Sequence, residues 1–130
     1  MILLIQTILF HLLEYFLLFL VPALLKSDDA RIIFMSSTVG REARAYWGAY
    51  SVSKFGIEGF AKTLSEELEK TKISVNTVNP GKMRTEMRRT AYPAEDSSTV
   101  PLPEEKSQAV AFLLSSSSPK INGEQLTISD

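Results

Sequence analysis

Residues 30–36, Ala-Arg-Ile-Ile-Phe-Met-Ser, form a short apolar run with β-branched residues after a polar turn, which predicts a buried β-strand. An amphipathic helix is predicted at 49–70, because large apolar residues recur every four positions from 60 to 68 while charged residues occupy the other face. Residues 73–78, Ile-Ser-Val-Asn-Thr-Val, predict a second strand, which the Asn-Pro-Gly breaker at 79–81 ends.

The C-terminal part continues this alternation. A helix is predicted to start at 103–105, Pro-Glu-Glu, because proline and acidic residues favour the first helical turn. It runs through Leu114 and is ended by the serine run 115–118 and Pro119, after which residues 125–128 predict a last strand. Strands that alternate with helices imply an α/β fold, here a parallel sheet of about three strands with covering helices.

Residues 1–25 are almost wholly apolar and carry a single charged residue, Glu14. Three interpretations compete. The favoured one is a buried helix of a soluble fold, whose last turn Pro22 would kink. A transmembrane helix has the right length, but Glu14 and His11 would lie in mid-span, where ionisable groups are costly. A secretory signal is disfavoured because the segment lacks a basic start and a clear cleavage site.

Composition excludes several classes of function. The 130 residues are enough for one domain. The 14 Lys and Arg against 15 Asp and Glu leave a net charge of -1, so no global positive field attracts nucleic acid. The chain has no Cys and one His, which excludes disulfides, a catalytic cysteine, and thiolate or multi-histidine metal sites. These absences suit a cytoplasmic location.

The places to look for chemistry are the loops after Ser36 and Val78, because ligands bind at the carboxyl ends of parallel strands. The first loop leads into Tyr50 and Lys54, which share one helix face at a spacing of four residues. A neighbouring ammonium favours the phenolate, so the pair suits a general acid or base. By itself this pair is a weak signal, because a tyrosine and a lysine at this spacing are common by chance.

The order of the motifs makes the signal specific. Ser-Thr-Val-Gly at 37–40, the Tyr-x-x-x-Lys pair at 50–54 and Pro-Gly-x-x-x-Thr at 80–85 together resemble the active-site signature of the short-chain dehydrogenase/reductase family. The resemblance extends almost continuously over 20–130, and the stretch 84–96 resembles the bacterial YciK branch of that family. It implies a partial Rossmann-type doubly wound sheet and an NAD(P)-dependent oxidoreductase acting on a small-molecule carbonyl or alcohol.

The resemblance also implies roles for individual residues. Tyr50 would protonate the carbonyl oxygen during hydride delivery, and Lys54 would favour the phenolate form of Tyr50 and bind the nicotinamide ribose. Ser37 would hold the substrate oxygen, where negative charge develops. Ser36 is the adjacent alternative, but the spacing to the glycine favours Ser37.

On the cofactor side, the resemblance implies contacts from the segment that follows the second strand. Thr85 and the Met83 backbone would contact the nicotinamide carboxamide, while Pro80 and Gly81 would shape the turn beneath the ring. The cofactor is NADP or NAD, and the residue that selects between them falls outside the matching part.

The chain also departs from the family pattern. Its six glycines do not form the glycine-rich turn that holds a cofactor pyrophosphate at a helix N-terminus. We therefore expect residues 1–130 to be one partial domain, the C-terminal half of the family fold: an apolar helix at 1–26, then the catalytic segment and last strand at 27–130. The first strand would expose an apolar edge, and activity of this chain alone is in question.

Two further expectations concern partners. The resemblance implies a homo-oligomer that forms through the helices at 1–26 and 49–70. The alternative to an enzyme is a non-catalytic remnant that acts as an interaction segment or as a membrane-associated segment through residues 1–25.

A local excess of positive charge lies in residues 82–92, Lys-Met-Arg-Thr-Glu-Met-Arg-Arg-Thr-Ala-Tyr. The resemblance makes this region a flexible substrate lid, which would prefer an anionic substrate or a cofactor phosphate. The competing and favoured interpretation is a solvated helix face, as charge runs usually are.

Overall fold

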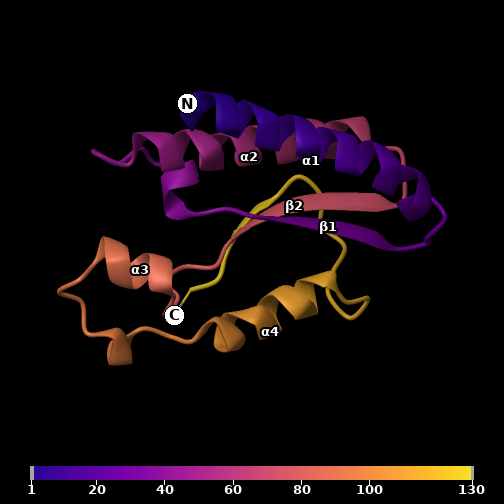
Figure 1. The fold of residues 1–130 in the computed structure, drawn as a ribbon. Helices are drawn as coiled ribbons and strands as arrows, with labels where there is room; N and C mark the ends of the chain where they lie inside the picture. The colour runs from indigo at the N-terminus through magenta and orange to yellow at the C-terminus, as the bar shows by residue number, and fades with distance from the viewer. Residues whose placement is uncertain (1, 130) are drawn as a thin grey trace.

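The structure, a computed structural model, describes residues 2–129 and their side chains from residue 11 onward. Its helices and strands follow one another in the order predicted from the sequence, with one addition, α3 (Figure 1). They are α1 (Ile2–Leu24), β1 (Ala30–Met35), α2 (Gly48–Glu67), β2 (Ile73–Asn79), α3 (Glu86–Ala91), α4 (Pro103–Leu114) and β3 (Gln125–Thr127), with short 3-10 turns at Thr38–Gly40 and Ser97–Thr99.

The three strands form one parallel sheet in the order β1-β2-β3, which confirms the predicted α/β class. Every residue of β2 is buried, and Val75 and Val78 are completely inaccessible. β1 lies at the edge of this sheet. The Ala30 amide donates to the carbonyl of Lys72, just before β2, and the Ser36 amide donates to the carbonyl of Val78 in β2. The backbone groups of the residues between them therefore alternate toward β2 and toward the open edge.

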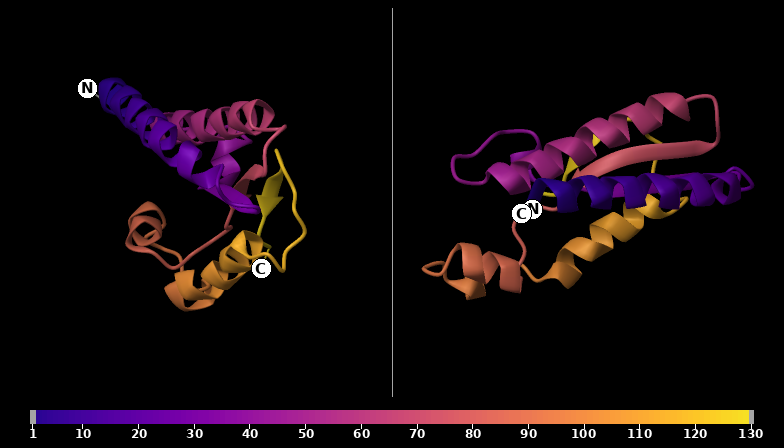
Figure 2. Two further views of the ribbon diagram at one scale, coloured as in Figure 1. Left: turned by 90° about the vertical axis from the view of Figure 1, so that its right-hand side faces the viewer. Right: turned by 45° about the horizontal axis from the view of Figure 1, so that its top comes forward.

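Helices cover the two faces of the sheet (Figure 2). α1 and α2 lie side by side over one face, and α4 lies beneath the other. The main core fills the space between α1, α2 and the sheet, where Leu17, Phe34, Ala61 and Val75 are buried. The Phe34 and Phe60 rings meet edge to face with centroids 5.7 Å apart.

The expectation that the first helix is buried on most of its faces is wrong. One stripe of α1 packs on the core, through Leu13, Leu17, Leu20, Val21 and Leu24. The opposite face is exposed because no described helix or strand lies on the side of α1 that faces away from α2 and the sheet (Figure 2). Exposed fractions reach 62% for Phe16 and 84% for Phe19.

Among the described residues, no helix is long and apolar enough to cross a membrane.

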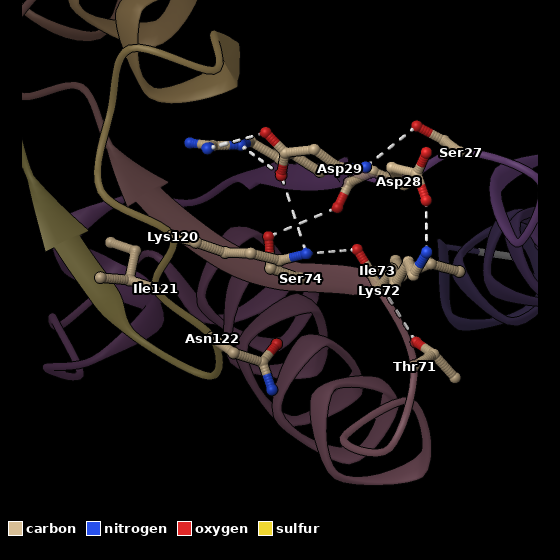
Figure 3. Close-up of polar contacts among 12 residues, drawn as sticks. Ser27, Asp28, Asp29, Thr71, Lys72, Ile73, Ser74, Lys120, Ile121 and Asn122 are labelled. Carbon is tan, nitrogen blue, oxygen red and sulfur yellow. Dashed lines mark hydrogen bonds and ion pairs between the residues drawn. The ribbon is translucent and has the colours of Figure 1, made fainter.

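A polar network fastens the α1–β1 connection to the end of the sheet where the strands begin (Figure 3). Lys72 forms an ion pair with Asp28, and Asp29 pairs with Arg31 at 3.0 Å and with Lys120 at 3.7 Å. The hydrogen bond from Arg31 lowers the pKa of Asp29. Arg31 also donates to the carbonyls of Leu113 and Ser118, at 3.1 and 3.0 Å, and so satisfies the C-terminal end of α4.

Candidate active site

The loops after β1 and β2 meet at the carboxyl edge of the sheet, as parallel pairing requires. Asn79 Nδ2 donates to Thr38 Oγ1 at 3.0 Å and joins the end of β2 to the turn after β1. The Gly81 amide donates back to Asn79 Oδ1 at 3.1 Å. Gly81 has a φ of 73°, a conformation that glycine adopts without strain. The Pro80–Gly81 turn is therefore held directly beside the loop that carries Ser37.

Tyr50 and Lys54 lie on the same face of α2, near its N-terminal end. The Lys54 Nζ lies 5.7 Å from the centre of the Tyr50 ring. It donates a hydrogen bond of 2.9 Å to the carbonyl of Met35, the last residue of β1. Burial lowers the pKa of Lys54, because a desolvated ammonium is less stable than one in water. The ammonium thus links the Tyr50 face of α2 to the end of β1.

The two serines after β1 differ in their surroundings. Ser36 is 4% exposed, and its hydroxyl lacks a hydrogen-bond partner of good geometry among the described residues. It lies beside Gly40 and Glu58, in the interior. Ser37 is half-buried with extended backbone, and its hydroxyl does not cap the short 3-10 turn that follows. Of the two side chains, that of Ser37 is therefore the more accessible to solvent.

Gly40 brings the turn after β1 into direct contact with α2. A Cβ at this position would lie 2.9 Å from the Lys54 Cβ, 2.9 Å from Ser36 Oγ and 3.0 Å from the Lys54 carbonyl carbon. Such distances are shorter than ordinary van der Waals contact, so only glycine allows the close approach. The glycine of the Ser-x-x-Gly motif is therefore required by the packing that positions Lys54.

A buried ion pair beneath the site was missed by the sequence analysis. Arg41 Nε and Glu58 Oε1 are 2.8 Å apart, and Glu58 also accepts hydrogen bonds from Thr77 at 2.6 Å and Gln125 at 3.1 Å. Arg41 in turn reaches Thr127 and the Leu126 carbonyl of β3, both at 2.9 Å.

The environment of Glu58 favours its charged form. Burial raises the pKa of Glu58, but the nearby hydroxyls of Ser36 and Thr77 and the Arg41 guanidinium lower it by more. The carboxylate stays ionised and ties α2 to β2 and β3. The signal in the sequence is the spacing, because Glu58 follows Lys54 by the same four residues that separate Lys54 from Tyr50.

The segment after β2 returns past the site. Thr85 starts α3, where its hydroxyl accepts a hydrogen bond of 3.2 Å from the Arg88 amide. Met83 is half-buried, and the next amide, that of Arg84, donates to the Pro101 carbonyl at 2.8 Å. Within the described part of the chain, the amides of Met83 and Thr85 have no hydrogen-bond acceptor. Thr85 therefore has a structural task as an N-cap, whether or not it binds a ligand.

An aromatic cluster joins α3 to the loop before α2. The Trp47 ring lies 5.7 Å from the Tyr50 ring and 6.0 Å from the Tyr92 ring, measured between centroids. Arg44 donates to the Tyr92 hydroxyl at 2.6 Å, and the Arg88 guanidinium lies 4.6 Å from the Tyr92 ring centre. These contacts place the predicted lid segment against the same loop that leads into Tyr50.

A cavity of about 510 Å³ lies elsewhere, between α2, β2 and β3. Residues from all three elements line it, among them Lys62, Val75, Asn76 and Gln125, and it includes none of the predicted site residues. The predicted residues instead lie at the carboxyl ends of β1 and β2 and on the adjoining part of α2.

Comparison with known proteins agrees with this arrangement. The family model for short chain dehydrogenase matches residues 6–96. The uncharacterized oxidoreductase YciK of Escherichia coli K12 is 51% identical over 77 residues, which cover 59% of this chain and 30% of that protein. Carbonyl reductase family member 4 of Danio rerio is 39% identical over 109 residues, or 78% of this chain and 44% of that protein.

Solved structures give the same result. A short chain dehydrogenase from Salmonella enterica serovar Typhi superposes with a TM-score of 0.78 at 40% identity, over 82% of this chain and 44% of that one. A short chain dehydrogenase from Shigella flexneri complexed with NADP gives a TM-score of 0.76 at 40% identity with the same coverages.

The E. coli CFT073 short chain dehydrogenase complexed with NADPH gives a TM-score of 0.77 at 39% identity, also over 82% of this chain and 44% of that one. This chain thus spans less than half the length of these relatives. A model match over most of the chain, together with the arrangement of the Ser, Tyr and Lys motifs along one sheet edge, identifies it as a member of the short chain dehydrogenase family.

Proposed function

We propose that this chain provides the catalytic residues for hydride transfer between NADP or NAD and a small-molecule carbonyl or alcohol. The observation that carries the proposal is the position of Lys54. Its ammonium lies 5.7 Å from the Tyr50 ring centre while it is hydrogen-bonded to the end of β1, next to Ser37. The serine, tyrosine and lysine that the reaction needs therefore come from the end of β1 and from α2, and the Lys54 hydrogen bond joins these two elements.

Each residue has a distinct task in this proposal. Tyr50 donates a proton to the carbonyl oxygen, or accepts one from the alcohol in the reverse direction. The Lys54 ammonium favours the phenolate of Tyr50, because opposite charges stabilise each other at short range. Ser37 donates a hydrogen bond to the same substrate oxygen as negative charge develops on it.

The residues at this edge fit the nicotinamide end of a dinucleotide. The Lys54 ammonium is a donor for ribose hydroxyls, and the amides of Met83 and Thr85 are uncommitted donors for a carboxamide oxygen. The Pro80–Gly81 turn lies beside them without a bulky side chain at Gly81. When bound, a nicotinamide cofactor supplies or accepts the hydride. The relatives complexed with NADPH and NADP support this choice of cofactor.

The exposed apolar face of α1 supports a second copy of this chain as a partner. Large apolar side chains of both helices are more than two-fifths exposed: Leu12, Tyr15, Phe16, Leu18 and Phe19 on α1, and Val52 and Phe55 on α2. An apolar surface of this kind is stabilised when a partner covers it, and a two-fold axis would pair the two helices with their own copies. We place the resulting assembly in the cytoplasm.

The same face favours the second candidate function, a non-catalytic remnant that acts as an interaction segment. The two candidates differ in what they require of Tyr50. An enzyme needs its hydroxyl, whereas an interaction segment needs the α1 surface and is indifferent to the phenol.

The test is carbonyl reduction measured by NADPH consumption over a panel of small aldehydes and ketones, with Tyr50→Phe against wild type. Loss of the proton donor is expected to reduce kcat by about 100-fold or more. Tyr46→Phe is the matched control, because Tyr46 is fully exposed outside α2 and should leave the rate unchanged. Turnover that survives Tyr50→Phe would refute the proposed role of Tyr50.

A further inference from the structure

Arg44 differs from the other arginines around the site because its Nε and Nη2 have no acceptor among the residues that the structure describes. Arg88 forms an ion pair with Glu95 at 2.6 Å, and Arg89 forms one with Glu86 at 2.6 Å. Arg84 is engaged by the carbonyls of Ser98 and Val100, both at 3.1 Å. These contacts account for the arginine charge of the lid segment, and therefore the lid arginines are not free to bind an anionic substrate.

The position of Arg44 is fixed by aromatic rings. Its guanidinium lies 5.4 Å from the Trp47 ring centre and 5.7 Å from that of Tyr92, and Nη1 donates to the Tyr92 hydroxyl at 2.6 Å. Across the residues that the structure describes, Nε and Nη2 of Arg44 donate to no protein group. Glu42, two positions earlier, forms no ion pair with it in the same part of the chain.

We propose that Arg44 binds the carboxylate of an oxo-acid substrate whose carbonyl carbon is reduced beside Tyr50. This inference rests on the proposed function and adds the substrate class. The free edge of the guanidinium, Nε with Nη2, has the spacing of a carboxylate and binds it in a bidentate manner. One guanidinium matches one negative charge, which favours a carboxylate over a phosphate dianion.

The arrangement around Trp47 suits a substrate with a spacer between its carbonyl and its carboxylate. Arg44 and Tyr50 both contact the Trp47 ring, on which the rest of the substrate would lie. The carbonyl and the carboxylate are then separated by several carbon atoms, and the apolar spacer is covered by the indole. Lys54 adds a second positive charge on the Tyr50 side, so the local field attracts an anion.

A purely structural role for Arg44 would be a latch between the loop before α2 and the lid segment. Such a latch would use the Nη1 hydrogen bond and the two ring contacts, but it would not use Nε or Nη2. Tyr92 is also held by Arg88 and Trp47. Arg44 is therefore not needed to hold Tyr92 in place. In the described part of the chain, no other arginine of the site has both Nε and Nη2 free.

The test uses Trp47, the single tryptophan of the chain, as an intrinsic fluorescent reporter at the proposed site. The full chain is titrated without cofactor with 5-oxohexanoate and with its uncharged methyl ester. Wild type is expected to show saturable quenching by the acid, with at least fivefold weaker binding of the ester. Arg44→Gln should weaken binding of the acid about tenfold and bring it to the level of the ester.

Two further variants make the result specific. Arg89→Gln removes the same charge from α3, where Arg89 is 73% exposed and paired with Glu86, and should leave binding of the acid unchanged. Arg44→Lys keeps the charge but loses the fork, so it should bind the acid with intermediate strength. Equal binding of the acid by wild type and Arg44→Gln would overturn the inference, as would the absence of saturable quenching in wild type.

The outcome is separable from that of the proposed function. Saturable binding of 5-oxohexanoate that depends on Arg44, without any NADPH-dependent turnover, would contradict the proposed function and leave the carboxylate site standing. Turnover with the same KM for acid and ester, in wild type and Arg44→Gln alike, would support the enzyme and overturn the substrate class.

Discussion

Gly40 controls how closely the turn after β1 approaches the backbone of Lys54. We predict that Gly40→Ala lowers the free energy of unfolding by about 1–3 kcal/mol, because the added Cβ would lie 2.9 Å from two side-chain atoms and 3.0 Å from backbone. Urea unfolding followed by circular dichroism measures this.

Gly59 provides the control for this substitution. It lies within α2, and a Cβ there would meet no atom within 4 Å. Gly59→Ala should therefore raise the free energy of unfolding by about 0.5–1 kcal/mol, since alanine favours the helix. A Gly40→Ala variant as stable as wild type would show that the contact with Lys54 is not tight.

Glu58 makes the stability of the fold depend on pH. Its folded pKa is lower than that of an unfolded glutamate, because the hydrogen bonds and the Arg41 charge outweigh burial. Its stabilising contribution is therefore complete above about pH 5 and is lost as the pH falls through the folded pKa. Glu58→Gln should cost about 3 kcal/mol at pH 7, because it leaves Arg41 without its partner.

The measurement is urea unfolding of wild type and Glu58→Gln at pH 7, 5, 4 and 3. The difference between the two proteins should shrink on the acid side. Glu66→Gln is the control, because its pair with Lys62 is exposed on both sides and surface pairs contribute about 0–1 kcal/mol. A constant difference between wild type and Glu58→Gln at every pH would contradict the role given to its ionised form.

At the scale of elements, α2 organises the site. Tyr50, Lys54 and Glu58 follow one another at intervals of four residues, so they form one stripe along the helix. Along this stripe lie a phenol, an ammonium that contacts the end of β1, and a buried carboxylate that contacts β2. The first two were predictable as a pair. The spacing also points to the third, Glu58, but it does not predict the ion pair of Glu58, because the partner Arg41 lies outside the helix.

The exposed face of α1 predicts self-association. Phe16→Glu combined with Phe19→Glu should shift the chain from an oligomer toward a monomer, because each charge would have to be buried in an apolar interface. Sedimentation velocity over a concentration series measures this. Both side chains are more than three-fifths exposed in the single chain, so the double variant should keep the far-ultraviolet circular dichroism of wild type.

A charge at Leu17 distinguishes association from folding. Leu17 is 5% exposed and belongs to the core, so Leu17→Glu should unfold the chain where the surface variant does not. A Phe16→Glu and Phe19→Glu variant that associates as wild type does would contradict the α1 interface.

At the scale of the whole molecule, local patterns predicted the elements well. Both long strands were predicted within one residue of their ends, since β-branched runs between breakers are strong signals. α3 was missed because its six residues lack an apolar stripe. The burial of the first helix was overestimated. An apolar sequence predicts that a helix packs against other elements, but it does not show how many of its faces those elements cover.

The site was predictable to a lesser extent than the fold. Ser37, Tyr50 and Lys54 were predicted from the order of the family motifs along the chain, and their catalytic roles stay a prediction. The aromatic cluster joins Tyr92 to Arg44 and Trp47, which lie 48 and 45 positions earlier, and no local pattern reveals such a contact. Its detection required the fold, in which α3 returns to the loop before α2.

The proposed function requires the sheet edge around Lys54 to bind a nicotinamide cofactor. The most direct measurement is a titration of the full chain with NADPH, followed by nicotinamide fluorescence, for wild type, Lys54→Ala and Lys70→Ala. Lys70 lies exposed just after α2 and serves as the control with the same loss of charge. We predict saturable binding that Lys54→Ala weakens about tenfold and Lys70→Ala leaves unchanged. A folded wild-type chain that shows no binding at millimolar NADPH, or equal binding by all three proteins, would contradict the proposed function.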